Sequence, residues 1–398
     1  MLDITRLISR AGRVLTGVDR VELAYLRALI ADDVPLYAIA RTTLGYVLLD
    51  QNGAAEIEGR VSGRTEWGPR DIYTAFAAGR PEPVKHAESD LRRFALSRCP
   101  SGLLSTMLAR HVPRSITYLN TGHSNITDRM LRAVRETLHG RIAIVLHDTI
   151  PLDFPDYQRD GIPGRFEAML LRIQNHADLI ICNSKATEDS FHRHSVDLKA
   201  RPDTVVAHLG VDIDLDEPRD TLELMVPEPP YFIAVGTIEP RKRYDLLLDV
   251  WDELVDHGPP RLYVCGPRGW KNEHVFQRLD EHSDGSAIYE LNELGDRELS
   301  ALMQNAVALL FPSDAEGFGL PPVEAAAMGV PVICQDLPVF REILGDIPVY
   351  VKGSDRYLWK NIIERLIHDQ TLGAKTVTEQ KFVPPTWEAH FNIVLKLC

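Results

Sequence analysis

The sequence predicts two α/β domains, each built on a parallel β-sheet with helices on both faces. The chain has 398 residues, more than a single hydrophobic core normally serves. Apolar runs of strand length alternate with helical patterns along almost all of it, which is typical of doubly wound sheets. An acidic stretch with four prolines, residues 212–230, has no strand pattern and separates two such series. We therefore expect domains over residues 1–217 and 218–375, followed by a closing segment over residues 376–398.

Each half of the chain contributes six predicted strands. Those of the first half are Leu2–Thr5, Pro35–Ala40, Ile116–Leu119, Ile142–Leu146, Leu179–Cys182 and Thr204–Ala207. Those of the second half are Tyr231–Val235, Arg261–Cys265, Ala287–Leu291, Val307–Phe311, Val330–Cys334 and Val349–Val351. Residues 41–70 interrupt the alternation and predict either a hairpin or a flexible flap.

Composition is ordinary for a soluble globular protein, with 44% apolar and 25% charged residues. No apolar run approaches the 18 residues that span a bilayer, and residues 1–13 lack the apolar core of a signal peptide. We therefore expect a cytoplasmic protein. The five cysteines are scattered singly, which predicts reduced core residues rather than a disulfide framework or a zinc site.

Charge is distributed unevenly along the chain. The net charge of −13 argues against a nucleic-acid partner. Residues 1–115 nevertheless carry 16 Lys and Arg against 13 Asp and Glu. Within them, residues 91–114 hold five arginines and no acid among Leu, Phe and Met. This segment is either a membrane-surface helix, which would make the protein peripheral at the inner face of the membrane, or an ordinary pair of surface helices.

A glycine-rich loop near residue 317 has the pattern of an anion site. It follows the predicted strand ending at Phe311 and opens a short helix that contains Pro322 and ends at Gly329. Free N–H groups and the positive end of the helix dipole suit a phosphate in such a loop. Glu316 and Glu324 flank the loop with seven residues between them, and Glu324 is expected in the first helical turn.

This loop resembles the donor site of the retaining family-4 glycosyltransferases, which carry an E-x7-E motif and have the GT-B fold. The resemblance covers almost the whole chain, strongly over residues 231–351 and loosely before residue 116. It implies two Rossmann-like domains that face a central cleft, with a nucleotide sugar bound mainly by the second. Glu316 is then expected to hold the sugar hydroxyls and Glu324 the ribose. The residues between them that line the donor are Gly317, Phe318, Gly319 and Leu320.

Consecutive cations follow the strand Tyr231–Val235. Gly236 opens a loop that contains Arg241 and Lys242 before the next helix. Cations at a helix start oppose its dipole, so they call for an anionic partner. A diphosphate whose charge grows as it departs fits this requirement. Relatives hold the donor diphosphate with an Arg and a Lys at these positions, but many also carry an Arg where this chain has Thr237.

Two further turns of the second half match the family less closely. Residues 265–270, Cys-Gly-Pro-Arg-Gly-Trp, resemble a Gly-x-x-Gly-Trp turn that is either structural or in contact with the donor. Asn292 stands where relatives usually have a glycine beside the nucleotide base, so it is a donor-binding candidate that leaves the base unidentified.

In the first half, strand ends supply the candidates. His147 and Asp148 follow the strand Ile142–Leu146, whose carboxyl end should face the cleft. Relatives with a similar His-Asp-x-x-Pro sequence use this region beside the acceptor and the donor sugar, so His147 is also a catalytic candidate. His123 follows a neighbouring strand. Ser184 reads as the N-cap of a following helix.

Both ends of the chain also match the family pattern. Gly17 and Arg20 open the first long helix, where relatives place a loop near the donor phosphates and the acceptor. Residues 386–396 resemble the closing helix that returns to the N-terminal domain in GT-B enzymes.

The resemblance implies an enzyme that transfers a hexose, such as mannose, from a nucleoside-diphosphate sugar to a glycan or lipid-linked acceptor hydroxyl. The anomeric configuration would be retained, and cell-surface polysaccharide synthesis is the expected setting. No Asp-x-Asp motif accompanies the donor loop, so no metal or other cofactor is expected. Two alternatives stay open. One is a sugar-nucleotide epimerase on the same fold, and the other is a non-catalytic donor-binding subunit of a polysaccharide-assembly complex.

Overall fold

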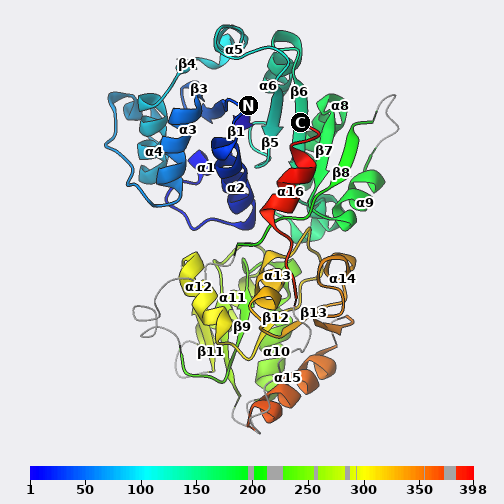
Figure 1. The fold of residues 1–398 in the computed structure, drawn as a ribbon. Coiled ribbons are helices and arrows are strands. Elements are labelled where there is room, and N and C mark those ends of the chain that lie inside the picture. The colour runs from blue at the N-terminus through cyan, green and yellow to red at the C-terminus, as the bar shows by residue number, and fades with distance from the viewer. Residues whose placement is uncertain are drawn as a thin grey trace.

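The computed structural model folds into two α/β lobes joined end to end (Figure 1). It describes residues 1–195, 201–212, 227–254, 259–282, 287–292, 294–353, 355–371 and 382–398. Both predicted domain boundaries, near residues 217 and 375, lie outside these ranges, as does most of the predicted linker. The boundaries therefore stay predictions, while the content of each lobe is clear.

The N-terminal lobe contains an eight-stranded sheet with the order β4-β3-β2-β1-β5-β6-β7-β8. Pairs β2–β3 and β3–β4 are antiparallel, and the other pairs are parallel. The strands are β1 (Leu2–Asp3), β2 (Ala38–Thr42), β3 (Gly45–Leu49), β4 (Ser97–Cys99), β5 (Thr117–Asn120), β6 (Arg141–Leu146), β7 (Leu179–Cys182) and β8 (Asp203–Val206). All six predicted strands are present, within a few residues of their expected limits.

The helices of this lobe connect and cover the strands. They are α1 (Thr5–Ser9), α2 (Gly17–Ala31), α3 (Gln51–Val61), α4 (Glu82–Arg93), α5 (Leu104–His111), α6 (Asp128–Arg132), α7 (Ile150–Asp153), α8 (Ile162–His176) and α9 (Lys185–Arg193). Four shorter turns are η1 (Ile72–Ala77), η2 (Ser101–Leu103), η3 (Ala133–Thr137) and η4 (Pro155–Tyr157). Residues 41–70 begin with the β2–β3 hairpin, as one alternative predicted, and continue into α3, which the sequence pattern did not indicate.

The C-terminal lobe contains a fully parallel six-stranded sheet, β11-β10-β9-β12-β13-β14. Its strands are β9 (Tyr231–Val235), β10 (Arg261–Cys265), β11 (Ile288–Leu291), β12 (Ala308–Phe311), β13 (Val332–Gln335) and β14 (Val349–Val351). The turn η6 (Pro240–Lys242) precedes the first helix. The helices are α10 (Tyr244–Leu254), α11 (Glu273–Glu281), α12 (Asp296–Gln304), α13 (Leu320–Ala327), α14 (Pro338–Leu344) and α15 (Arg356–Thr371). This strand order is that of a Rossmann-like domain.

The last helix, α16 (Trp387–Val394), crosses back and packs on the N-terminal lobe (Figure 1). The Tyr25 hydroxyl lies 2.8 Å from Nε2 of His390, and both side chains are buried. The Phe391 ring meets Tyr25 edge-on, with centroids 5.0 Å apart. The last helix thus contacts α2 of the N-terminal lobe.

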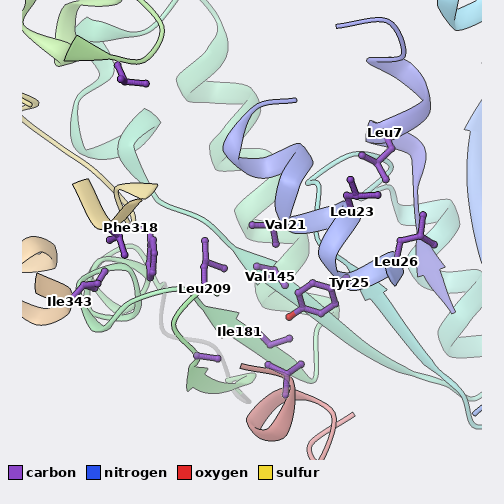
Figure 2. Packing of buried hydrophobic residues seen from close by; sticks show 14 of the residues in the cluster. Leu7, Val21, Leu23, Tyr25, Leu26, Val145, Ile181, Leu209, Phe318 and Ile343 are labelled. Atoms are coloured by element: carbon purple, nitrogen blue, oxygen red, sulfur yellow. The ribbon is translucent and has the colours of Figure 1, made fainter. Parts of the chain in front are cut away.

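The hydrophobic core is continuous between the lobes. One buried cluster joins Tyr25, Val145 and Leu209 of the N-terminal lobe to Phe318 and Ile343 of the C-terminal lobe. Figure 2 shows Phe318 beside Ile343 and near Leu209. Because apolar area is buried where the lobes meet, water exclusion stabilises the closed arrangement in which the loop at residue 318 contacts the N-terminal lobe.

Residues 91–114 do not form one membrane-surface helix. They comprise the end of α4, strand β4, turn η2 and helix α5, whose Leu104, Met107 and Leu108 are buried. Arg92 pairs with Asp71, and Arg93 pairs with Asp90. The alternative of ordinary elements packed on the N-terminal domain is the better description. The five cysteines are free, and Cys182, Cys265 and Cys334 are core residues as predicted, whereas Cys99 and Cys398 are partly exposed. No helix within the described ranges is long and apolar enough to cross a bilayer.

Candidate functional site

The predicted donor residues meet where the strand order of the C-terminal sheet reverses. Strands β9 and β12 are neighbours there, and the chain continues from them toward opposite edges of the sheet. Loops that follow such adjacent strands diverge, which leaves a crevice where α/β proteins commonly bind ligands. The loop after β9 carries Gly236 to Lys242, and the loop after β12 carries Glu316 to Gly319. The fold therefore brings together two motifs that are about 75 residues apart.

At the centre of this site, Glu316 accepts from two cations. Arg241 Nη1 lies 2.7 Å and Lys242 Nζ 2.6 Å from the same carboxylate oxygen, Oε1. Arg241 also donates to the Ala315 carbonyl at 2.8 Å, and its Nε lies 2.7 Å from the Glu239 carboxylate. Lys242 Nζ is 4.2 Å from the centroid of the Phe311 ring. These contacts fix both cations before any anionic ligand arrives.

Burial and pairing shift the ionisation of this group. Burial by itself raises the pKa of Glu316, but Arg241 and Lys242 outweigh it and hold the pKa below its usual value. Burial lowers the pKa of Lys242 by more than Glu316 raises it. For Arg241, the neighbouring Glu316 and Glu239 outweigh burial and raise the pKa. Glu316 is therefore a carboxylate at neutral pH, and Arg241 is a permanent cation.

Glycines are required in both loops. Gly236 has a φ of +136°, and a Cβ there would lie 3.3 Å from Lys242 Nζ. Gly319 has a φ of +87° and faces the ring of Phe340. A Cβ on Gly317 would collide with the His147 carbonyl of the other lobe. The Gly-Phe-Gly sequence thus lets the backbone turn and approach the N-terminal lobe closely.

Glu324 lies in the second turn of α13, not in the first as predicted, because the helix begins at Leu320. It is buried, and its carboxylate pairs with Arg20 of the N-terminal lobe at 2.6 Å. A Cβ on Gly17 would lie 3.3 Å from the Leu320 side chain. The start of α2 therefore reaches the donor loop, and Arg20 joins one of its two glutamates.

Interlobe hydrogen bonds that sequence reasoning missed secure the loop. Ser184 caps α9 as predicted. Its hydroxyl also donates to the Gly317 carbonyl at 2.7 Å. The Thr187 hydroxyl donates to the same carbonyl at 3.2 Å. On α14, Glu342 accepts from the backbone N–H of Lys185 at 2.6 Å. Nothing in the local sequence distinguishes a cap that also binds across an interface from an ordinary cap.

His147 and His123 lie side by side at the carboxyl ends of their strands. His147 is 6% exposed, and its Nε2 lies 2.6 Å from the Thr121 carbonyl. His123 Nε2 lies 2.8 Å from the Val145 carbonyl, and the two ring centroids are 5.1 Å apart. Carbonyls only accept, so each Nε2 carries a proton and each Nδ1 is left as an acceptor. His147 is thus among polar groups beside the donor loop, as its strand-end position predicts.

Burial lowers the pKa of His123 to about 4 and that of His147 to about 3. In the folded protein both rings stay neutral, whereas in the unfolded chain each histidine takes up a proton below a pKa of about 6.5. Each histidine therefore lowers the free energy of unfolding as the pH falls. At pH 5 the loss is about 2 kcal/mol per ring.

We expect His123→Asn to lose less stability than the parent protein between pH 7 and pH 5. Asparagine tolerates the left-handed φ of +55° at this position. Urea unfolding at the two pH values measures the difference. His139→Asn is the matched control, because His139 is exposed and has a φ of +50°. If the stability of His123→Asn and of the parent protein depended on pH in the same way, the lowered pKa of His123 would be contradicted.

Asp148 is partly exposed beside the donor residues, and desolvation raises its pKa while nearby Arg241 opposes the rise. Its carboxylate accepts from the Ile150 N–H at 3.0 Å, where the short helix α7 begins. Asp148 therefore lies close enough to Arg241 to raise the pKa of that guanidinium, while the hydrogen bond of Asp148 to Ile150 is structural.

A second contact between the lobes involves Tyr157 of η4. Its hydroxyl donates to Asp314 at 2.9 Å, and its carbonyl accepts from Trp270 Nε1 at 2.7 Å. Arg243 pairs with Asp245 and with Asp314. The turn that ends at Trp270 therefore contacts the N-terminal lobe through Trp270, which the sequence did not indicate.

The structure gives Asn292 a local role. With its amide oriented so that nitrogen donates, it bonds the Gly266 carbonyl at 2.9 Å and Glu290 at 3.0 Å. It thereby joins the turns after β10 and β11. Its predicted contact with the nucleotide base stays a prediction.

Two hollows elsewhere in the N-terminal lobe contain none of the predicted site residues. The first has a volume of about 390 Å³ and lies between α5 and the α6–η3 segment. The second has a volume of about 270 Å³ and lies beside α7 and α8. The chemistry-bearing residues lie instead where the closed lobes touch, so we place the candidate site there on the strength of its contacts.

Comparison with known proteins identifies the second lobe. Residues 223–381 match the family described as glycosyl transferases group 1. The C-terminal lobe is a group 1 glycosyltransferase domain. The resemblance seen in the donor loop is thus confirmed at the level of this group, and assignment to the retaining family 4 stays a prediction.

Curated relatives extend the similarity beyond the C-terminal lobe. It is 29% identical over 377 residues to the serotype-specific mannosyltransferase WbdA of Escherichia coli, covering 89% of this chain and 39% of WbdA. It is 33% identical over 139 residues to the O-antigen chain mannosyltransferase RfbU of Salmonella typhimurium, covering 34% of this chain and 38% of RfbU. The chain therefore spans about two fifths of the length of either relative.

Solved structures confirm the GT-B fold. HepE of Anabaena, in complex with UDP and glucose, superposes with a TM-score of 0.57 at 17% identity, covering 74% of this chain and 80% of HepE. TarM superposes with a TM-score of 0.52 at 15% identity, covering 74% of this chain and 55% of TarM. At these identities the similarity concerns the fold alone.

Proposed function

We propose that this chain transfers a hexose from a nucleoside-diphosphate sugar to an acceptor hydroxyl, with retention at the anomeric carbon. The observation that carries the proposal is the Glu316 carboxylate held between Arg241 and Lys242 at the β9–β12 crevice. Mannose is the favoured sugar, because WbdA and RfbU are named as mannosyltransferases. A glycan or lipid-linked acceptor of cell-surface polysaccharide synthesis fits those names.

The charges suit departure of a diphosphate. As the bond from the anomeric carbon to the diphosphate oxygen breaks, negative charge accumulates on that oxygen beside Arg241 and Lys242. The acceptor oxygen forms the new bond to the anomeric carbon, and its proton passes to the departing phosphate. This sequence conserves atoms and charge without a protein nucleophile. Glu316 orients the two cations and is placed to accept from hydroxyls of the sugar.

Measuring sugar transfer and nucleotide release with a panel of GDP-, UDP- and dTDP-sugars tests the proposal. We expect one donor to release nucleoside diphosphate and to give an α-linked product from an α-linked donor. Activity should survive excess EDTA, because the two cations neutralise the diphosphate in place of a metal. Loss of activity with EDTA and its recovery with Mg²⁺ or Mn²⁺ would contradict the metal-free part.

The same panel separates the two alternatives. An epimerase converts the sugar nucleotide without transfer to an acceptor, and a non-catalytic subunit binds the donor without turnover. The Glu316, Arg241 and Lys242 cluster favours the transferase over a subunit that only binds, because the cations lie where the leaving group would develop charge.

We also propose that the N-terminal lobe contacts an anionic membrane through η1 and β4. Ile72 is 81% and Phe76 71% exposed, four residues apart in η1. Arg98 lies over the neighbouring Tyr73 ring at 4.9 Å, and Arg80 is exposed at the end of the turn. Large apolar side chains with arginines beside them suit the interface of an anionic bilayer.

We expect the protein to co-sediment with phosphatidylglycerol vesicles at low salt and to be released as salt rises. The double variant Ile72→Ser, Phe76→Ser should bind at least about ten-fold more weakly, because two inserted side chains are lost. Val383→Ser, at a 78% exposed site beyond the C-terminal sheet, is the control. Equal binding by the double variant and the parent protein rules this surface out.

A further inference from the structure

The N-terminal sheet has a reversal of strand order of its own. Strands β1 and β5 are parallel neighbours, and the chain continues from them toward opposite edges. The loop after β1 leads into α1 with Arg6 and Arg10, and the loop after β5 contains Thr121, Gly122 and His123. The corresponding crevice of the C-terminal sheet holds the proposed donor site. A ligand is expected at such a reversal, and the donor does not account for this second one.

Two arginines at this crevice share one buried carboxylate. Asp19 is fully buried, and its oxygens lie 2.6 Å from Arg6 Nε and 2.8 Å from Arg10 Nε. The backbone N–H of Thr16 also donates to Asp19, at 2.7 Å. Asp19 is thereby saturated, and two guanidinium groups face one carboxylate. Two further acids, Asp3 and Glu22, are buried near these arginines.

The terminal nitrogens of these arginines are largely unused. Arg6 Nη2 makes one long contact with the Thr16 hydroxyl, at 3.3 Å. Within the described ranges, the Nη groups of Arg10 have no protein acceptor. Each arginine side chain is about one quarter exposed, at 25% for Arg6 and 24% for Arg10. Asp19 holds each guanidinium by its Nε, so the remaining N–H groups are oriented donors with little entropy left to lose.

The β5 loop forms the other wall. A Cβ on Gly122 would lie 3.0 Å from Arg6 Cδ, so this loop is in contact with Arg6. Thr121 is fully buried, and its hydroxyl has no hydrogen-bond partner in the described structure. Glu22 also faces this wall, where it accepts from the Leu7 N–H at 3.0 Å, and burial raises its pKa well above the usual value. His123 and His147 are neutral. A Cβ on Gly122 would collide with the Glu22 carboxylate, and Asp3 accepts from Tyr118 and Asn125 nearby. Burial raises the pKa of Asp3 as it does that of Glu22, which favours the neutral form of both acids and reduces their repulsion of an incoming anion.

We propose that the crevice between β1 and β5 binds an anionic group of the acceptor, a phosphate or a carboxylate, through Arg6 and Arg10. The acceptor role rests on the proposed transferase function. The location fits this role, because Gly17 lies against Leu320 and because Arg20, the residue after Asp19, pairs with Glu324. A group anchored here lies on the N-terminal side of the donor loop. Retention requires the acceptor hydroxyl to reach the anomeric carbon on the face that the diphosphate leaves, so the anchored group would hold the acceptor while its hydroxyl extends to that face.

The site is tested by titrating the full chain with inorganic phosphate and with acetate. The titrations are then repeated by calorimetry on protein that has been saturated with a nucleoside diphosphate. The nucleotide occupies the donor cations, so any further anion binding reports a second site. We expect saturable phosphate or acetate binding that weakens about ten-fold or more in Arg10→Gln and is partly restored in Arg10→Lys. Arg13→Gln is the matched control, because Arg13 is an exposed arginine of the same loop.

Preference for phosphate would indicate a phosphorylated acceptor, and preference for acetate an acidic sugar. Failure of both anions to bind, equal binding by Arg10→Gln and the parent protein, or equal losses in Arg10→Gln and Arg13→Gln would overturn the proposal. So would complete exclusion of phosphate by the nucleotide. The measurement needs no turnover, so its failure is distinguishable from failure of the transferase function, which the donor panel tests separately.

Discussion

Replacing Arg241 or Lys242 with alanine is expected to lower turnover by about 100-fold or more. Each supplies a charge that is already oriented where the departing diphosphate would become more negative, and loss of one such contact typically has this effect. In the structure both cations bind the same oxygen of Glu316, so either variant also leaves that carboxylate with one cation. Steady-state rates with the donor identified by the nucleotide panel measure the effect.

A control is needed because the Lys242 side chain is buried and the Arg241 side chain is largely enclosed. Arg356→Ala removes an equivalent charge from α15, where the side chain is 54% exposed and pairs with Asp249. It should leave the rate unchanged. Circular dichroism and the urea midpoint establish whether Arg241→Ala and Lys242→Ala are folded. Two folded variants with normal rates would exclude the proposed diphosphate site.

Exchanging the two glutamates of the donor loop for glutamine should separate their roles. Glu316→Gln is expected to reduce the chemical step by about 100-fold, because the neutral amide no longer holds both cations in place. Glu324→Gln is expected to weaken nucleoside-diphosphate binding by about 10- to 100-fold, the value of a charge-assisted hydrogen bond to ribose. Glu324 pairs with Arg20 in the structure, so a ribose bound at Glu324 would share or replace that partner.

Calorimetric titration with the nucleoside diphosphate, combined with single-turnover rates, distinguishes the two effects. Glu298→Gln is a control outside the loop, since Glu298 only caps α12 through the Gly295 N–H at 2.7 Å. If Glu316→Gln lost nucleotide affinity while Glu324→Gln retained it, the donor would lie in the reverse orientation along the loop.

The sequence by itself determined the two sheets and the components of the donor site. Buried parallel strands are apolar throughout, so runs such as Tyr231–Val235 and Ala308–Phe311 stand out between amphipathic helices. The glycines at 236, 317 and 319 were readable for a similar reason. Backbone turns and close approaches there exclude a Cβ, so the residue type carries the information locally. Glu316, Arg241 and Lys242 were found because short loops hold each motif together.

Only the tertiary structure decided which of these residues meet and what else joins them. Ser184 reaches Gly317 across 133 residues, and Tyr157 reaches Asp314 across 157 residues. Such pairs depend on how the two lobes close, and no local pattern specifies that geometry. The arginines at positions 6 and 10 look like ordinary surface charges in the sequence. They become a candidate anion site only because α2 buries Asp19 beside them and β5 places Gly122 against Arg6.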